Sequence, residues 1–275
     1  MYNTFIGGIT MDILLEVLEE TIVMLPMLLV MYFLLEYYEM HNLFVLNKYK
    51  RLGPLLGAVL GLIPQCGISV LASLSFLERK ISLGTLMSVY IATSDEAIPL
   101  LLSNYALRDD VVSILIIKFI AAVIFGYFID MFIHFEMKER TIHNEHLNHS
   151  LWKCVLERTL KVYLFIFIVH LALSYLFEFI GEEFIAGLLL NKNSFQPLLT
   201  SLFGLIPHCI VSIVLTGLYS KDLLSFASLI AGLMSNAGLG LIALLRYKID
   251  IKDFIRIVGL LTLCSMTVGL FLQFL

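Results

Sequence analysis

Residues 54–69 read PLLGAVLGLIPQCGIS, and residues 197–212 read PLLTSLFGLIPHCIVS. Nine of the sixteen aligned positions are identical, at a constant offset of 143 residues. Shared leucines are common in any apolar chain, but shared prolines, cysteines and serines at fixed places are not. Because self-similarity at a fixed spacing is the signature of a repeated structural unit, the sequence predicts a fold of two related halves.

The composition around these two stretches is that of a membrane protein. Of the 275 residues, 60% are hydrophobic and 15% are charged, and the mean hydropathy is +0.94. Soluble domains average about 45–50% apolar and about 25% charged residues. The net charge of -4 offers no basic surface, so nucleic-acid binding is excluded.

Apolar stretches of about 20 residues or more, the length that crosses a bilayer, recur along the whole chain. We expect an all-helical integral membrane protein, with a first repeat over residues 1–140, a cytoplasmic loop over 141–157 and a second repeat over 158–275. An amphipathic helix over residues 10–20 is predicted before the first span. The predicted segments are 21–40, 54–78, 82–105 and 110–134 in the first half, and 158–181, 197–219, 223–246 and 252–275 in the second.

The positions of Lys and Arg predict the topology, because cytoplasmic loops of membrane proteins are enriched in both. If residues 54–78 and 197–219 are re-entrant hairpins of two half-helices, 14 of the 18 Lys and Arg residues lie on the cytoplasmic side. The first hairpin then enters from the cytoplasm, the second enters from the exterior, and both chain ends lie outside. The two halves become an inverted repeat, as in many secondary transporters.

Each hairpin is expected to turn at a proline, Pro64 or Pro207, because proline interrupts a helix. Each is followed by an apolar stretch with an interruption, over residues 93–99, which include Pro99, and over residues 235–240. Irregular backbone at membrane depth is tolerated only inside protein or beside a water-filled cavity. The tips and breaks are therefore predicted to line a transport site near the bilayer midplane.

Asp95 and Glu96 are adjacent carboxylates inside an otherwise uncharged stretch. A charge at that depth costs several kcal/mol unless it is compensated, so the pair is interpreted as a cation or proton site. Two structural explanations stay open: a helix end in the headgroup zone, and neutralisation by Lys118 on the neighbouring span.

Further candidate metal ligands are Gln65, Cys66, His208 and Cys209 at the hairpin tips. Thiolate, imidazole and carboxylate together suit a transition metal or a thiophilic metalloid. The alternatives are that the cysteines are small buried residues and that His208 is merely hydrogen-bonded at a tip. Hydroxyl and amide groups beside the breaks could support substrate binding; they belong to Ser69, Thr93, Ser94, Ser212, Ser235 and Asn236.

His143, His146 and His149 surround Glu145 in the predicted cytoplasmic loop. They are interpreted either as a transient collector of metal or as part of a solvated loop. Asp130, near a predicted inner helix end, is expected to be a partnered structural group.

The GLIPQCGIS stretch, the TSDEAIP break and the GLIPHCIVS stretch resemble a bacterial family of ten-helix heavy-metal exporters, also labelled manganese transporters and related to ArsP-like permeases. Counting each hairpin as two helices gives ten segments, in agreement with the family. The resemblance implies efflux of a metal or metalloid across the bacterial cytoplasmic membrane. ArsP-like permeases carry a tighter cysteine pair in the first motif, where this chain has Ser69, which disfavours an organoarsenical substrate.

We therefore predict a secondary active exporter of a divalent cation, manganese first, that works by alternating access. The sequence contains no HExxH, GxSxG or GxxxxGK motif, so neither an enzyme nor direct use of ATP is expected, and a proton or sodium gradient would drive transport. No permanently bound cofactor is expected. The alternative is a transporter of an organic or oxyanionic or metalloid substrate, coupled to protons or sodium through the acidic pair; a channel and a homodimer are left open.

Overall fold

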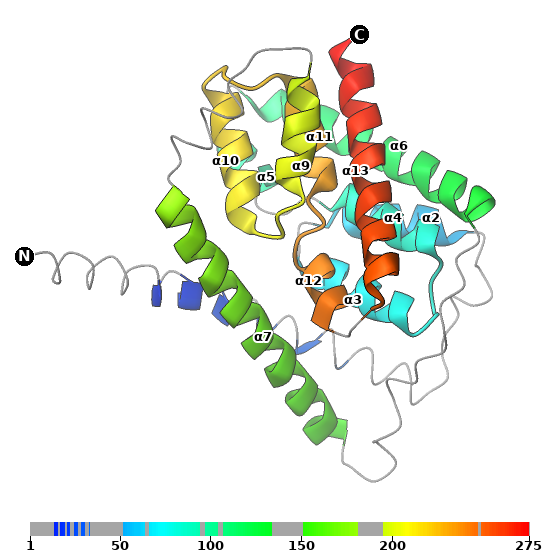
Figure 1. Cartoon of the computed structure of the whole chain (residues 1–275), viewed down its shortest axis with the longest axis vertical. Coiled ribbons are helices and arrows are strands. Elements are labelled where there is room, and N and C mark those ends of the chain that lie inside the picture. Colours follow the sequence, from blue (N-terminus) through cyan, green and yellow to red (C-terminus); the bar gives the residue numbers. More distant parts are fainter. Residues whose placement is uncertain are drawn as a thin grey trace, which may run out of the picture. The chain divides into compact units, whose positions relative to one another are not determined.

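The computed structural model describes residues 14–15, 17–19, 21–22, 25–26, 29–30, 33, 52–63, 66–93, 97–103, 107–133, 151–180, 195–246 and 249–274 (Figure 1). Regular secondary structure in these ranges is helical throughout. This confirms the predicted all-helical class.

The chain forms two compact units. Unit 1 joins Met1–Leu43 with His143–Ile185, and unit 2 joins Phe44–Ile142 with Ala186–Leu275. Each unit takes residues from both predicted repeats, so the compact units cut across the repeats. Unit 2 contains both proline-bearing stretches and both interrupted stretches that the sequence singles out.

Unit 1 is built around α7 (Leu151–Ile180). The hydroxyl of Thr21 donates to Val17 O at 2.7 Å and lies 3.3 Å from the hydroxyl of Tyr163 on α7. The helix begins at Leu151, whereas the sequence predicted loop up to residue 157 and a span from 158. Hydropathy marks only the apolar part of a helix, and the first turns of α7 carry Lys153, Glu157 and Arg158.

Unit 2 contains ten helices within its described ranges, five from each half of the sequence. Those of the first half are α2 (Gly53–Gly61), α3 (Cys66–Leu77), α4 (Leu83–Ala92), α5 (Ala97–Ser103) and α6 (Arg108–Phe132). Those of the second half are α9 (Gln196–Gly204), α10 (Cys209–Ser220), α11 (Phe226–Ser235), α12 (Leu239–Arg246) and α13 (Ile251–Gln273). The starts of α2, α3, α4 and α6 recur 143 residues later as the starts of α9, α10, α11 and α13. The offset seen in the sequence is thus also the offset of the helices.

Each half packs three helices together, α2 with α4 and α6, and α9 with α11 and α13. Glycines allow the close approach. A Cβ added to Gly126 on α6 would lie 2.8 Å from Pro54 Cβ, and a Cβ added to Gly269 on α13 would lie 2.9 Å from Pro197 Cβ. Both pairs of residues are related by the same offset, so the two halves use the same contact.

The starts of α4 and α11 are capped in the same way. Ser82 Oγ and Ser225 Oγ each accept a hydrogen bond from the backbone N–H three residues later, which satisfies one of the unpaired donors at a helix start. Ser82 Oγ donates to Asp130 Oδ2 at 2.6 Å, and Ser225 Oγ donates to Gln273 Oε1 at 3.0 Å. Asp130 is therefore a partnered structural group, as predicted.

The halves also contact one another, since α12 packs against α3 and α5 packs against α10. Ser73 Oγ on α3 lies 2.9 Å from Gly240 O on α12 and 2.6 Å from Ser69 O. It also lies 2.7 Å from the hydroxyl of Tyr90, a fully buried residue on α4. Because the single Ser73 proton points to these carbonyls, Tyr90 donates to Ser73. This cluster joins three helices from both halves.

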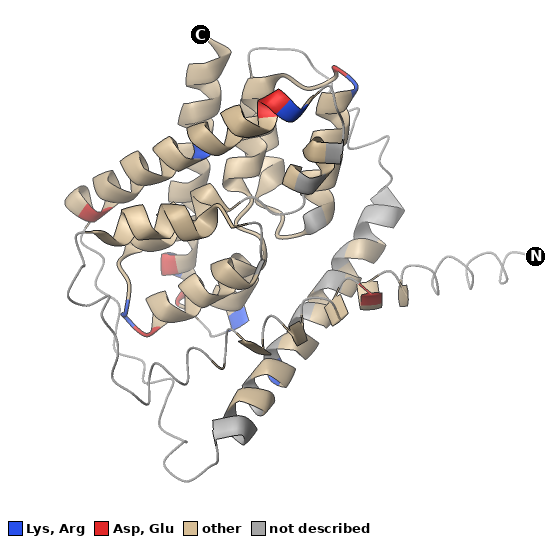
Figure 2. Cartoon of the chain, turned by 180° about the vertical axis from the view of Figure 1, so that it is seen from behind, with Lys and Arg blue, Asp and Glu red and all other residues tan. Residues whose placement is uncertain are grey.

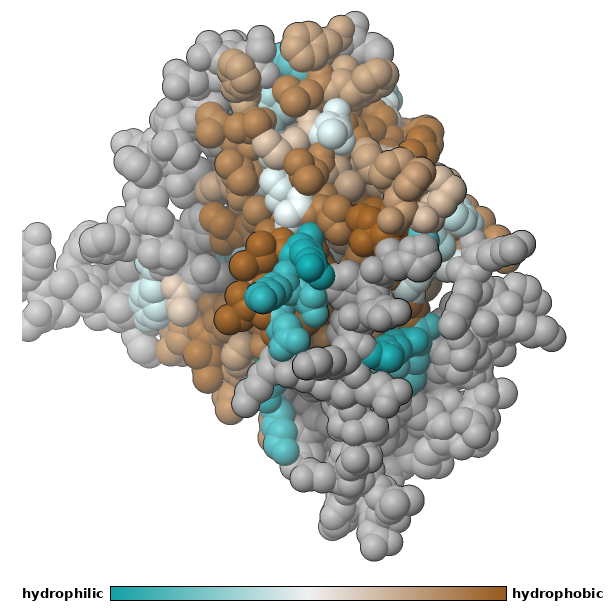
Figure 3. All heavy atoms as spheres, turned by 45° about the vertical axis from the view of Figure 1, so that its right-hand side comes forward, coloured by the Kyte–Doolittle hydropathy of each residue, from teal (hydrophilic) through white to brown (hydrophobic). Residues whose placement is uncertain are grey.

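Three helical stretches in the described ranges have the length and apolar composition of a membrane span: Arg108–Phe132, Phe226–Arg246 and Ile251–Gln273. The second, which is α11 and α12 with the break between them, is 94% buried in its apolar window, against 33% and 28% for the others. The broken stretch is therefore interior, while α6 and α13 expose apolar side chains. Figure 2 shows the described charged residues gathered mainly at helix ends, and Figure 3 shows a mostly hydrophobic described surface.

Candidate functional site

The first helix break lies between α4, which ends at Ala92, and α5, which begins at Ala97. It falls inside the interruption predicted over residues 93–99. Thr93 and Ala97, at the two edges of the break, are 3% and 1% exposed, so the chain enters and leaves it in the protein interior. Asp95, Glu96 and Ser94 lie outside the described residues.

Two of the predicted break residues have well-defined local roles. The hydroxyl of Thr93 donates to Val89 O at 2.7 Å, one turn back on α4, and its backbone carbonyl accepts from Lys118 Nζ. Pro99 lies in the first turn of α5, where its missing N–H would have no intrahelical partner. The helix thus restarts two residues before Pro99, whose side chain is not described.

The second break lies between Ser235 and Leu239, and buried polar groups hold it. Asn236, 2% exposed, donates from Nδ2 to Ser212 Oγ at 2.9 Å and accepts at Oδ1 from Gly238 N at 3.0 Å. Gly238 has φ 55°, a left-handed conformation that favours glycine. The hydroxyl of Ser235 turns back to Gly232 O at 2.9 Å. The structure therefore brings Asn236 and Ser212 together at this break.

At the start of α10, His208 is 1% exposed and serves as the N-cap, because Nδ1 accepts from Ile210 N at 3.1 Å. A neutral imidazole that accepts at Nδ1 carries its proton on Nε2, which makes Nε2 a donor. Metal ligation by His208 would need this capping bond to change. The geometry agrees with the alternative that His208 is hydrogen-bonded at the tip.

The remaining tip residues are described only in part. Cys66 and Cys209 are the first residues of α3 and α10, but their side chains are not described. Pro64 and Gln65 lie outside the described residues, while Pro207 lies in the non-helical connection between α9 and α10. Ser69, one turn into α3, is fully buried, and Gly240 approaches it so closely that an added Cβ would lie 2.9 Å from Ser69 O.

Lys118, on α6, is the functional candidate whose contacts were hardest to predict from the sequence. It is fully buried. Its Nζ donates to Thr93 O at the end of α4 and, at 2.9 Å, to Leu233 O in the last turn of α11. Carbonyls in the last turn of a helix have no intrahelical donor and carry the negative pole of the helix dipole. One ammonium thus joins the ends of two helices from different halves, both of which stop at a break.

The sequence carried a signal for Lys118, namely one lysine within an uncharged apolar span. On the sequence alone, Lys118 was a possible counter-charge to Asp95 and Glu96. Its contacts with helix ends could not be foreseen, because they depend on how α4, α6 and α11 meet.

Within the ranges given above, no group of three or more His, Cys, Asp and Glu side chains lies close enough to hold a metal ion. His143, His146 and His149 fall outside the described residues.

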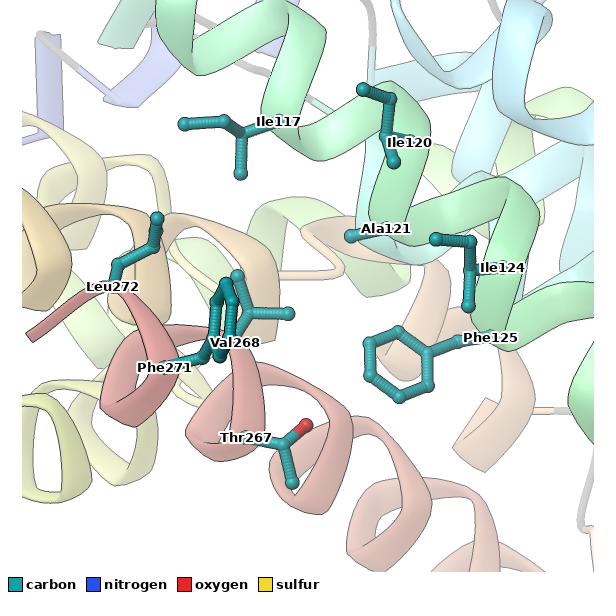
Figure 4. A pocket seen from close by; sticks show the side chains of 9 residues that line it. All are labelled: Ile117, Ile120, Ala121, Ile124, Phe125, Thr267, Val268, Phe271 and Leu272. Atoms are coloured by element: carbon teal, nitrogen blue, oxygen red, sulfur yellow. The ribbon is translucent and has the colours of Figure 1, made fainter. Parts of the chain in front are cut away.

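A cavity of about 440 Å³ lies between α6 and α13 (Figure 4). Its lining is almost wholly apolar and includes Ile120, Phe125, Val268 and Phe271. None of the predicted site residues lines it. It therefore does not correspond to the predicted transport site.

Comparison with curated proteins and with solved structures gives no match. Residues 19–178, more than half of the chain, match the family described as "Putative, 10TM heavy-metal exporter". This agrees with the buried helix breaks, the exposed apolar helices and the resemblance seen in the sequence motifs. The chain is a multi-pass membrane protein and belongs to this family of heavy-metal exporters.

Proposed function

We propose that this protein is a secondary active transporter that exports a divalent metal cation, manganese first, across the bacterial cytoplasmic membrane. The observation that carries the proposal is the pair of interior helix breaks at equivalent places in the two halves. Secondary transporters use such discontinuous helices to build binding sites at the bilayer midplane. The family supplies the class of cargo.

We infer that α2 with α3, and α9 with α10, are re-entrant hairpins of an inverted repeat. These helices contain 9 or 12 residues, which corresponds to about 14 or 18 Å at 1.5 Å per residue. Each arm can therefore cross about half of a hydrocarbon core of about 30 Å. With this topology, both chain ends lie outside.

Asp95 and Glu96 form the core of the proposed metal site. They belong to a short connection whose edges, Thr93 and Ala97, are buried, and carboxylates suit manganese. Gln65, Cys66 and Cys209 at the tips are proposed as further ligands, and His208 would join them once its capping bond from Ile210 N is released. Ser69, Ser94, Ser212, Ser235 and Asn236, together with Thr93, would support the site from the breaks.

Alternating access requires a transport unit that moves relative to a fixed scaffold. We propose that unit 2, which carries both breaks, is the transport unit and that unit 1, with the predicted first and fifth spans, is the scaffold. Cytoplasmic His143, His146 and His149 would collect metal before it enters.

A second candidate is a transporter of an organic or oxyanionic or metalloid substrate, with protons or sodium bound by the acidic pair. The observation in its favour is the buried positive charge of Lys118 beside the first break. Donors at the second break, such as Asn236 Nδ2, would then contact the anion.

The test is binding of manganese, iron, cobalt, zinc and cadmium ions to the purified full chain and to two double variants. Asp95→Asn with Glu96→Gln removes the proposed ligands. Asp109→Asn with Asp110→Asn removes the same charge from the start of α6 and serves as the matched control. We expect the first variant to bind the metal at least about tenfold more weakly, a loss of about 1.4 kcal/mol, and the control to bind like the parent.

Counterflow of the bound metal in proteoliposomes then establishes transport and its direction. If no divalent ion binds the parent, or if the Asp95 and Glu96 variant binds as well as the parent, the metal proposal fails. The acidic pair would then be a coupling site, in line with the second candidate.

A further inference from the structure

The buried ammonium of Lys118 lies where helices from both halves end. Two of its hydrogen bonds go to main-chain carbonyls, Thr93 O at the C-cap of α4 and Leu233 O on α11. Both helices are ten residues long and stop at a break. Lys118 thus links the ends of α4 and α11, one from each broken stretch, through their main-chain carbonyls.

The two carbonyl-bearing helix ends around Lys118 form a site suited to a cation. Each helix end carries about half a negative elementary charge, so one monovalent cation balances two ends. In secondary transporters, the C-terminal ends of half-helices and unwound carbonyls are groups that coordinate a coupling sodium ion. Here the ammonium of Lys118 supplies the cation from within the chain.

Comparison of the two halves separates the charge of Lys118 from the packing of its side chain. The residue equivalent to Lys118 at the offset of 143 is Leu261 on α13, which is also fully buried. The helices α9, α11 and α13 pack together as α2, α4 and α6 do. A leucine therefore suffices for packing at this place, and the charge of Lys118 has another purpose.

The charged residues occur together in one half. The equivalents of Asp95 and Glu96 are Gly238 and Leu239, so the first half carries two carboxylates and a lysine where the second carries none. Lys118 is bonded to Thr93 O, two residues before Asp95 in the chain. The lysine therefore belongs to the same functional region as the acidic pair.

We propose that Lys118 takes the place of a coupling sodium ion at the junction of the two broken stretches, so that transport does not require sodium. Lys118 is a positioning residue, since it holds the ends of α4 and α11 beside the substrate site. The inference rests on the proposed transport function and specifies its ion requirement.

The experiment compares the full-length parent with Lys118→Ala in sodium and in choline medium of equal ionic strength. Thermal unfolding in detergent and metal uptake into proteoliposomes are measured in each medium. We expect the parent to give the same values in both. Lys118→Ala should unfold about 4–10 °C lower in choline, and sodium should restore about half of that loss because it can occupy the vacated carbonyl site. Its metal uptake should become sodium-dependent.

Leu261→Ala is the matched control, because it shortens the equivalent buried side chain without exposing a cation site. It should lose stability equally in sodium and choline. Lys118→Gln keeps hydrogen-bond donors but removes the charge, and should also acquire a response to sodium. This variant keeps the test decisive if Lys118→Ala does not fold.

A parent whose unfolding or transport depends on sodium would overturn the proposal. So would a Lys118→Gln variant that matches the parent in both media, since the charge would then be unnecessary, or an equal sodium response in Leu261→Ala. If the parent binds and moves no metal in any medium, the proposed function fails instead. The sodium response in unfolding can still be read in that case.

Discussion

Asp130 and Gln273 are separated by 143 residues, and each accepts a hydrogen bond from the serine that caps a helix ending at a break. Asp130 accepts from Ser82 Oγ at 2.6 Å and also from Gly84 N at 2.7 Å, whereas Gln273 accepts from Ser225 Oγ at 3.0 Å. The first contact involves a carboxylate at a helix N-terminus, where negative charge is favourable. The contact of Asp130 with Ser82 is therefore expected to stabilise the first half more than the equivalent contact of Gln273 with Ser225 stabilises the second.

Replacing Asp130 with alanine should destabilise the protein by about 2–3 kcal/mol, because two hydrogen bonds to a charged acceptor are lost and a backbone donor loses its partner. Gln273→Ala removes one neutral, exposed bond and should cost about 0.5–1 kcal/mol. Thermal unfolding of the purified variants measures both. Equal losses would show that the carboxylate does not anchor α4.

The small residues on α6 and α13 give a second prediction. A Cβ on Gly126 would overlap Ser88 Oγ, and a Cβ on Gly269 would lie 2.6 Å from Ala231 Cβ. Since overpacking typically costs about 1–3 kcal/mol, Gly126→Ala and Gly269→Ala should each lower the unfolding temperature.

Gly259→Ala on α13 is the control for this pair, because a Cβ there would meet nothing within 4 Å. Alanine in a helix interior is favoured over glycine by about 0.5–1 kcal/mol, so this variant should be neutral or more stable. A loss of stability in Gly259→Ala comparable to that of Gly126→Ala would contradict the packing explanation.

Much of the architecture could be predicted because the two halves share prolines, glycines and polar residues at the places where helices begin or end. Polar residues interrupt the apolar stretches at Thr93 and Asn236, so both breaks were found from local sequence, whereas glycines such as Gly126 and Gly259 lie inside unbroken helices. Apolar length located the helices, but missed the charged start of α7 at Leu151. The hairpins and the inverted orientation remain predictions.

The partners of the polar residues could not be predicted, because they depend on how distant helices meet. Asp130 was expected to be partnered, yet only the packing of α6 on α4 identifies Ser82 as the partner. Lys118 was recognised as a charge in a span, but its bond to Leu233 O requires α11 from the other half. Whether Asp95 and Glu96 bind metal stays a prediction, since their positions are not described.

The last prediction concerns the second break, where Asn236 connects α11 to α10. Asn236→Ala removes the bond to Ser212 Oγ and the acceptor of Gly238 N. Each of Asn236→Ala and Ser212→Ala leaves one buried donor unsatisfied, Gly238 N in the first and Asn236 Nδ2 in the second, at a cost of about 1–3 kcal/mol. Asn236→Ala loses two hydrogen bonds where Ser212→Ala loses one, so it should be the less stable of the two. Asn236→Asp keeps an acceptor for Gly238 N but loses the donor to Ser212.

Thermal unfolding compares the stability of the three variants. Metal uptake into proteoliposomes measures how far each substitution impairs transport. If the break holds the transport site in shape, Asn236→Ala should lose uptake even at temperatures where it remains folded, and Asn236→Asp, which buries a charge at a 2% exposed position, should be less stable than the parent. Full uptake in a folded Asn236→Ala would separate this break from the transport site and leave the first break, with Asp95 and Glu96, as its sole proposed location.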